Sequence, residues 1–194
     1  MGLFTTYKKW TDEQLMVAIG KNDYRAFDEL HERYSKRLLF FMLKMLNHDE
    51  ERAQDLLQDL FLKIVERPHL FDTSKKFYTW IFTVAANMCR TEHRNNKKEI
   101  STDEIADSGN RQSPTDLIAQ VDARVFNEHL GRALDELQYE HRETFVLRFQ
   151  EGFSINEIAV MMNCSVGTVK SRIYYTTRKL ALDLEEFRPL LKRM

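Results

Sequence analysis

Apolar residues recur every three or four positions along nearly the whole chain, which is the spacing of one buried face of an α-helix. Residues that suit helix starts precede several of these runs: Thr11 and Gln14 have the spacing of a capping box, Asn22 and Asp49 can cap the next helices, and Pro114 suits a first helical position. The pattern predicts helices over about 12–20, 23–46, 50–66, 77–98, 114–137 and 140–149, followed by two short helices within 154–180. The predicted fold class is therefore all-α.

The pair of short helices near the C-terminus carries the clearest local signals. Ser154 and Glu157 have capping-box spacing at the start of the first helix, and Ser165 can cap the second. Asn163 lies between them, and asparagine tolerates the left-handed backbone that a tight turn requires. The sequence predicts two helices that meet at a tight turn.

The second helix of this pair is strongly basic. Residues 165–180 contain four basic side chains and no acidic one. An α-helix fits the major groove of DNA, and in a helix-turn-helix the N-terminal part of the second helix meets the base edges. The residues expected to contact DNA are Ser165, Thr168, Lys170, Ser171, Arg172, Tyr175 and Arg178. The alternative is an ordinary helical hairpin with a solvated basic face, but caps, turn and charge together favour the helix-turn-helix.

The predicted helix over 50–66 has an unusual outer face. Besides its core stripe, it carries a second stripe made of Asp55, Gln58, Leu62 and Val65. A surface helix with an ordinary polar back does not place Leu62 and Val65 there. Two interpretations stay open at this point: a docking face for a protein partner, or a helix covered on both sides by its own domain.

The predicted helix over 77–98 begins with more large apolar side chains than one buried face can take, among them Phe77, Tyr78 and Trp80. Arg90, Arg94, Lys97 and Lys98 follow, against Glu92 as the one acid. Aromatic side chains beside a basic face are used to stack and track single-stranded nucleic acid. Taken by itself, however, this segment favours the simpler interpretation of a core helix with a solvated basic end.

The charge is distributed unevenly along the chain. The 194 residues carry 29 basic and 30 acidic side chains, so the total says little about nucleic acid. Residues 99–116 contain five acidic residues and one arginine, with Ser, Gly, Asn, Gln and Pro between them, which is typical of a flexible linker. We therefore expect two small helical domains, over 10–98 and 117–184, joined by an acidic linker over 99–116.

No arrangement of residues points to catalysis. The sequence has no phosphate-binding GxxxxGK loop, no HExxH and no nucleophile elbow, so we expect neither an enzyme nor a cofactor. Cys89 and Cys164 lie far apart and no Cys/His set has metal-ligand spacing, which predicts no metal site. No apolar run approaches the roughly 18 residues of a membrane span, and the N-terminus does not have the pattern of a signal peptide. We expect a cytoplasmic protein without membrane insertion.

Two stretches resemble the sigma factors of bacterial RNA polymerase, in particular the small two-domain extracytoplasmic-function (ECF) class. HRETFVLRFQEGFSINEIAVMMNCSVGTVKSRIYYTTRKL is similar to the fourth region of that family, and SVGTVKSR is its most specific part. AQDLLQDLFLKIVE, followed by FYTWIFTVAANMCRTEHR, is similar to the second region. The resemblance covers about residues 12–181, and both signatures occur in the family's order.

The resemblance implies a role for each surface. It places Asp55, Gln58 and Leu62 on the face that docks on core RNA polymerase. It places 71–80, with Asn87, Arg90, Arg94, Lys97 and Lys98, in the element that opens the minus-ten promoter DNA and holds a flipped base. The helix-turn-helix would read the minus-thirty-five duplex. The family also implies an anti-sigma factor as a partner, a free monomer and association with the nucleoid.

Two other classes of protein remain as alternatives. A helix-turn-helix regulator with a helical sensor domain would bind duplex DNA unaided, usually as a dimer at a palindrome. A helical interaction protein would bind no DNA. The order of the two signatures disfavours both.

Overall fold

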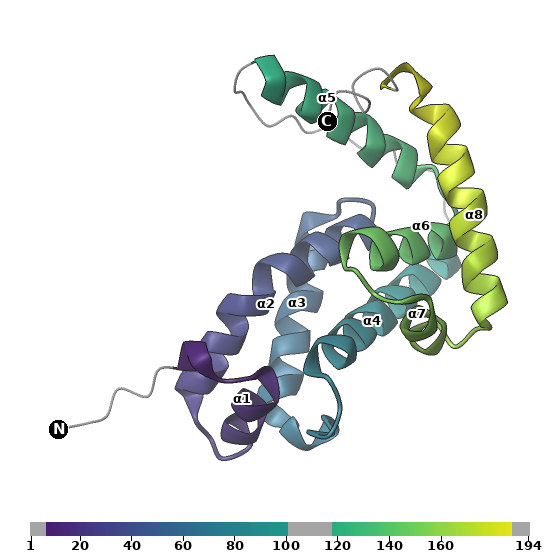
Figure 1. Ribbon diagram of the computed structural model, residues 1–194. Helices are drawn as coiled ribbons and strands as arrows, with labels where there is room; N and C mark the ends of the chain where they lie inside the picture. The colour runs from purple at the N-terminus through teal and green to yellow at the C-terminus, as the bar shows by residue number, and fades with distance from the viewer. Residues whose placement is uncertain (1–6, 101–117, 188–194) are drawn as a thin grey trace. The chain divides into compact units, whose positions relative to one another are not determined.

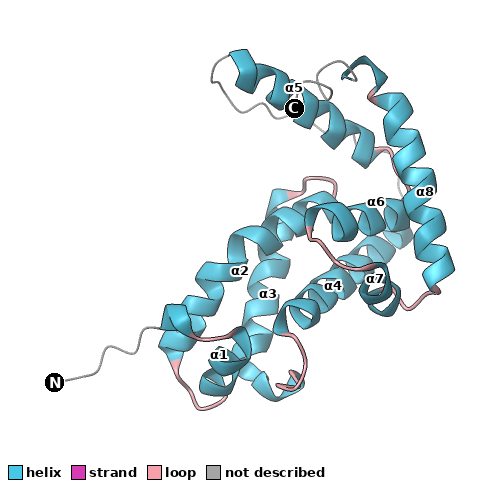
Figure 2. Cartoon of the chain, viewed as in Figure 1, coloured by secondary structure: helices cyan, strands magenta, loops and turns pink. Residues whose placement is uncertain are grey.

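The computed structural model describes residues 7–100 and 118–187. The chain divides into two compact units, with the boundary between Thr102 and Asp103. Helices are the one kind of regular secondary structure in the described ranges (Figure 2), so the predicted all-α fold is confirmed there. The predicted linker starts too early, because α4 continues through Ile100, and the rest of 99–116 lies outside the described residues together with Pro114.

In the N-terminal unit, the described residues form the helices α1 to α4 (Figure 1). Its elements are η1 (Tyr7–Lys9), α1 (Asp12–Ile19), α2 (Tyr24–Met45), α3 (Glu50–Glu66), η2 (Pro68–Leu70) and α4 (Phe77–Ile100). The capping box of Thr11 and Gln14 is present, and Asp49 caps α3. The cap of α2 is a correction: Asp23 accepts from the amides of Arg25 and Ala26, while Asn22 adopts a left-handed φ of 63° in the preceding turn.

The core of this unit lies where α2 packs against α3 and α4. Its fully buried side chains include Leu30, Leu38, Phe41, Leu60, Ile64, Phe77, Ile81 and Phe82. Aromatic rings join the helices edge-on: the ring centroids of Phe41 and Phe82 are 5.6 Å apart, and those of Tyr34 and Phe77 are 5.3 Å apart. Such pairs add about 0.5–1.5 kcal/mol beyond the burial of their area, so α4 is held firmly by its inner face.

The C-terminal unit contains the predicted helix pair. Its elements are α5 (Ile118–Asp135), α6 (Tyr139–Phe145), the π-helical turn η3 (Val146–Gln150), α7 (Ile155–Met161), α8 (Val166–Asp183) and η4 (Glu185–Phe187). Ala133 and Leu134 of α5 form a buried cluster with Leu137, which follows that helix, and with Leu180 of α8. Phe149 of η3 is 52% exposed. The π-helical turn at η3 closes i→i+5 hydrogen bonds, so α-helical spacing no longer predicts which side chain faces the core.

Candidate nucleic-acid and polymerase interfaces

Helices α7 and α8 meet at the tight turn that a helix-turn-helix requires. At the start of α7, the amide of Ser154 donates to Glu157 Oε2 over 2.9 Å and the amide of Glu157 donates to Ser154 Oγ over 3.2 Å. The turn passes through Asn163 at a φ of 48°, and the amide of Cys164 donates to the carbonyl of Ala159. The capping box and the left-handed turn expected from the sequence are therefore confirmed.

The start of α8 is fixed by two hydroxyl groups that were expected to contact DNA. Ser165 Oγ accepts from the amide of Thr168 over 3.0 Å, and the two side-chain oxygens lie 2.9 Å apart. Each hydroxyl is thus already hydrogen-bonded within the first turn. Because the N-cap bond uses one lone pair of Ser165, its capacity to accept further hydrogen bonds is reduced.

Four of the residues expected to read DNA share one face of α8. Thr168, Ser171, Arg172 and Tyr175 follow the i, i+3, i+4, i+7 spacing, with Ser171 and Tyr175 exposed and the other two half-buried. Arg172 also approaches Met162, with Nη1 3.9 Å from Sδ. Lys170 is exposed as well, but at 3.6 residues per turn it projects roughly 160° away from Arg172. Lys170 and Arg172 therefore flank α8 and do not share a face.

The outer stripe of α3 is open to solvent. Asp55 and Gln58 are exposed, Leu62 is 47% exposed and Val65 is 36% exposed. The interpretation of a helix covered on both sides by its own domain is therefore wrong. Acidic residues border this stripe, since Glu51, Asp59 and Glu66 are also exposed on α3. The result is a small apolar patch in an acidic surround.

Four of the eight residues expected at the minus-ten DNA lie on or beside the outer face of α4. Trp80, Asn87 and Arg94 recur every seven positions and so fall on one face. Arg90 lies beside them, and its Nη2 donates to Asn87 Oδ1. Trp80 is half-buried, whereas Asn87 and Arg94 are exposed.

Phe77 corrects the list of DNA contacts. Its side chain is 0% exposed, with its ring centroid 5.3 Å from that of Phe71 and 5.6 Å from that of Trp80. A ring enclosed in this way is part of the core and is not available to a base. Tyr78 lies on a different face from Trp80, with the guanidinium of Arg37 4.9 Å above its ring.

The acidic residue in the basic segment has a structural role. Glu92 is buried, and its Oε1 lies 2.6 Å from Nε of Arg52 on α3. Glu92 is the one acid of 77–96. Since Glu92 points inward, no acidic side chain of 77–96 lies on the outer face of α4 that carries Arg90 and Arg94. Lys97 and Lys98 follow on the described backbone of α4, but their side chains lie outside the described set.

The loop before α4 is held by a buried aromatic ring and by hydrogen bonds within the loop. Phe71 is only 4% exposed and anchors the loop to the core. Asp72 Oδ1 accepts from the amide and the hydroxyl of Ser74, over 3.0 and 2.7 Å, and these bonds lower the pKa of the Asp72 carboxyl. Lys75 and Lys76 are exposed immediately before the helix. The loop therefore ends in two exposed cations, four and five positions before Trp80 in the chain.

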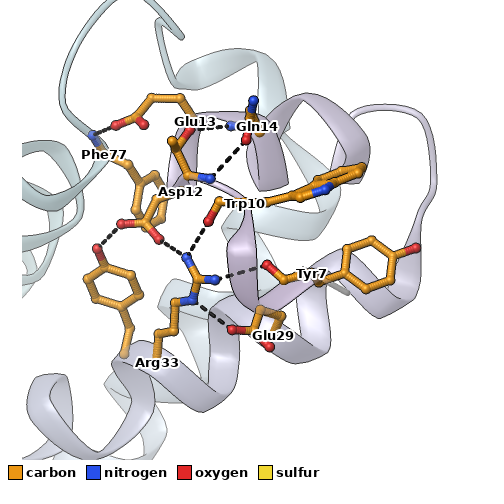
Figure 3. A network of polar contacts seen from close by, with 10 residues as sticks. Tyr7, Trp10, Asp12, Glu13, Gln14, Glu29, Arg33 and Phe77 are labelled. Atoms are coloured by element: carbon orange, nitrogen blue, oxygen red, sulfur yellow. Dashed lines mark hydrogen bonds and ion pairs between the residues drawn. The ribbon is translucent and has the colours of Figure 1, made fainter. Parts of the chain in front are cut away.

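Contacts from the N-terminal helix were missed by the sequence reasoning. The amide of Phe77 donates to Glu13 Oε1 over 3.0 Å, although the two residues are 64 positions apart. Arg33 of α2 donates to Asp12, the chain neighbour of Glu13, and to the backbone carbonyls of Trp10 and Tyr7 (Figure 3). In the sequence, Asp12 and Glu13 indicate only acids that favour a helix start, so no local signal could have revealed this link.

The described residues contain neither a helix that could span a membrane nor a group of side chains suited to a metal ion. None of their helices is both long enough and apolar enough to cross a lipid bilayer. Over the same ranges, no three His, Cys, Asp or Glu side chains come together in a way that could hold a metal ion.

Both interfaces coincide with stretches shared with known proteins. Residues 30–99 match the family model of sigma-70 region 2, and residues 128–180 match that of sigma-70 region 4. The ECF RNA polymerase sigma factor SigL of Mycobacterium tuberculosis is 30% identical over 158 residues, which cover 81% of this chain and 88% of SigL. The chain belongs to the ECF sigma factors of RNA polymerase. It is accordingly a promoter-directing sigma factor.

Other relatives agree with this assignment. The RNA polymerase sigma-H factor of Pseudomonas aeruginosa is 28% identical over 189 residues, covering 93% of this sigma factor and 96% of the relative. Among solved structures, the sigma factor RpoE in complex with the anti-sigma factor NepR, from Bartonella quintana, has a similar fold. Its TM-score is 0.66 at 22% identity, and the match covers 82% of this sigma factor and 96% of RpoE.

Proposed function

We propose that this sigma factor uses three separate helical faces for three contacts. The outer stripe of α3 docks on core RNA polymerase. The outer face of α4, with the loop before it, opens and holds the minus-ten DNA. The face of α8 described above reads the minus-thirty-five duplex. The observation that carries the proposal is the i, i+3, i+4, i+7 alignment of Thr168, Ser171, Arg172 and Tyr175 within 165–180, a stretch of the chain that contains no acidic residue.

The α3 stripe suits a basic partner surface with an apolar centre. Leu62 and Val65 offer apolar area, and Asp55 lies among further exposed acids of the same helix. Charges at the rim of such a contact steer the encounter, while apolar side chains at its centre contribute more of the affinity. Asp55, Gln58 and Leu62 are therefore our proposed polymerase contacts.

On α4, the proposal assigns different work to different side chains. The half-buried ring of Trp80 can stack on an unpaired base, and the exposed amide of Asn87 can hydrogen-bond a base edge. Arg90 and Arg94 suit phosphates of the opened strand. Lys97 and Lys98 stay predictions for the same strand. Phe77 drops out because it is buried, and Tyr78 drops out of the shared face.

On α8, base reading and phosphate binding fall to opposite flanks. Arg172 can pair in a bidentate manner with guanine, with Thr168, Ser171 and Tyr175 alongside. Lys170, on the other flank, suits a phosphate, as do Arg178 and the hydroxyl of Ser165 near the ends of the helix. The four basic residues of 165–180 neutralise at most about four phosphates, which corresponds to a salt slope near −4.

Such a short interface binds weakly by itself. Tethering both units to the polymerase makes the second DNA contact intramolecular, which raises the overall affinity without any new contact. The protein acts by binding and positioning, and the polymerase performs the chemistry. We infer that it is not an enzyme and that it works in the cytoplasm at the nucleoid, where the promoter DNA lies.

We propose that an anti-sigma factor binds this protein when it is not bound to core RNA polymerase. The similar sigma factor from Bartonella quintana is held by NepR. In this chain, the exposed Leu62 and Val65 on α3 and Val160 on α7 provide apolar surface that a partner could cover before polymerase arrives. We expect the free protein to be a monomer.

In vitro transcription tests the proposed function. Core RNA polymerase is incubated with a genomic fragment library, with and without the protein, and the 5′ ends of the transcripts are mapped. New start sites that share two upstream elements are expected. Unaided binding to duplex DNA without new starts would contradict the proposal.

A further inference from the structure

Helix α4 begins with a cap supplied by a distant part of the chain. Lys76 precedes the helix, and a lysine ammonium has donors but no acceptor, so it cannot cap the exposed amides. The amide of Phe77 instead donates to Glu13 Oε1 of α1 over 3.0 Å. This hydrogen bond is the largest cause that lowers the pKa of the Glu13 carboxyl, so the charged form is the one that the helix start favours.

The residue that caps α4 is itself held on a rigid support. Asp12, next to Glu13, accepts from Arg33 over 2.8 Å and from the hydroxyl of Tyr34. Arg33 also donates to Glu29 and to the carbonyls of Tyr7 and Trp10, as Figure 3 shows. These bonds fasten α1 to α2. Glu13 therefore lies on a helix that is fastened to α2, and both helices pack into the core.

The capped residue is also the centre of the aromatic cluster. The Phe77 ring contacts Tyr34 on one side and Phe71 on another, and Trp80 follows three positions later. Phe71 and Trp80 have their ring centroids 5.3 Å apart. A shift of the first turn of α4 would thus move Trp80 and the end of the loop over 71–76 together.

We propose that Glu13 is a positioning residue for promoter opening. Its hydrogen bond to Phe77 fixes the first turn of α4, and with it Trp80 and the loop, in the geometry that receives the unpaired base. The inference rests on the proposed function of α4 and its loop. Because Glu13 touches no DNA in this scheme, its effect belongs to the opening step and not to polymerase docking.

The test compares duplex and pre-opened promoters. Holoenzyme is assembled from core polymerase and the full chain, on a promoter mapped with the wild-type protein. With Glu13→Ala we expect open complexes to form about 10-fold more slowly on duplex DNA, the low end of what one hydrogen bond to a charged group contributes. On the same promoter with a non-complementary minus-ten bubble, the rate should stay within about twofold of wild type, since no opening is required there.

Two variants separate the hydrogen bond from other effects of the substitution. Glu13→Gln keeps an acceptor oxygen at the same reach and should open the duplex at nearly the wild-type rate. Glu32→Ala removes an exposed carboxylate of α2 and should change nothing. Loss of opening with Glu13→Gln equal to that with Glu13→Ala would overturn the hydrogen-bond mechanism.

A local cap separates positioning from stability. Lys76→Ser supplies an N-cap hydroxyl to α4 without any link to α1. We expect the double variant of Lys76→Ser and Glu13→Ala to regain thermal stability over Glu13→Ala alone, yet to open duplex promoters about 10-fold more slowly than the Lys76→Ser variant. Recovery of both properties would overturn the proposal, because Glu13 would then serve only to cap the helix.

The remaining outcomes distinguish a failure of the proposed function from a failure of the role of Glu13. If the wild-type protein starts no transcript from any promoter, the proposed function fails. If wild type opens promoters and Glu13→Ala opens the duplex equally fast, only the role of Glu13 fails. An equal loss on duplex and bubble templates would also overturn it, since the defect would then lie outside opening.

Discussion

Removal of the Arg33 side chain should destabilise the N-terminal unit and little else. Arg33 donates to Asp12 and to Glu29 over 2.8 Å each, and to the carbonyls of Trp10 and Tyr7 over 2.9 and 3.0 Å. Its side chain is only 25% exposed, and the two carboxylates are 23% and 13% exposed. Four of the five N–H donors of the guanidinium thus act on the N-terminal segment or on Glu29.

The magnitude follows from these four bonds. Hydrogen bonds between charged groups contribute about 1.5–3 kcal/mol each, and those to neutral carbonyls about 1 kcal/mol. Ordering a long arginine side chain costs about 2 kcal/mol, and partial exposure lets the carboxylates regain water. We expect Arg33→Ala to lower the free energy of unfolding by about 2–3 kcal/mol. For a unit of this size that corresponds to a fall in Tm of roughly 10–20 °C.

Tryptophan fluorescence isolates the right unit. The chain has two tryptophans, Trp10 and Trp80, and both belong to the N-terminal unit. Urea unfolding of the full chain followed at this signal therefore reports that unit alone. Arg33→Lys keeps the charge but not the planar fork, so it should fall between wild type and Arg33→Ala. Arg25→Ala, at an exposed position of the same helix, is the control and should change stability by less than about 0.5 kcal/mol.

A change below about 0.5 kcal/mol for Arg33→Ala, with an unchanged slope of the urea transition, would refute the argument. It would mean that water replaces all four bonds without a loss.

The other predictions address the proposed surfaces and the dependence on pH. Arg172→Ala should relax base preference in the minus-thirty-five element, by about 1–3 kcal/mol at one position, and leave polymerase affinity intact; sequencing of selected promoters checks the first effect, and a loss of polymerase binding would contradict the assignment. Asp55→Ala combined with Gln58→Ala should weaken binding to core polymerase, measured by titration with labelled protein, while the circular dichroism spectrum stays that of wild type. The pKa of Glu13 is lowered in the folded state, mainly by the Phe77 amide. Its contribution to stability is therefore present above the ordinary carboxyl pKa of about 4.3 and is lost as the pH falls through the folded-state value. When the urea midpoint is measured against pH, Glu13→Gln should reduce its fall at acid pH. Burial, and then the bond to Asp12, raise the pKa of Tyr34, so stability should fall as the pH rises above the usual tyrosine value of about 10, and Tyr34→Phe should remove that alkaline limb.

Features set by a few neighbouring residues could be predicted from the sequence. Capping boxes need only a hydroxyl and an acid or amide three positions apart, so Thr11 with Gln14 and Ser154 with Glu157 were both found. The turn at Asn163 follows from the tolerance of asparagine for a left-handed backbone. The outer stripe of α3 was visible because a single helical period assigns Leu62 to the side opposite the core.

Features set by contacts between distant segments could not be predicted. The start of α4 has so many aromatic side chains that periodicity alone does not decide which ones are buried, and Phe77 was wrongly placed at the DNA. Its burial depends on Tyr34 and Phe71, which come from other elements. The hydrogen bond between Glu13 and Phe77 joins α1 to α4 across 64 residues. The residues next to each of them in the sequence give no sign of this contact.

The inner face of α4 bears on how the outer face could open DNA. Flipping a base out of the duplex costs a few kcal/mol, and any ordering of protein side chains on binding would add to that cost. Phe77, Ile81 and Phe82 are fully buried, and Glu92 is tied to Arg52 of α3, so the helix is rigid before DNA arrives. The Trp80 ring is held in place by its packing on Phe77. A helix held in this way can apply nearly all of its interaction free energy with the opened strand to keeping the bases apart, which is why we expect variants that loosen its inner face to slow promoter opening more than they weaken binding to polymerase.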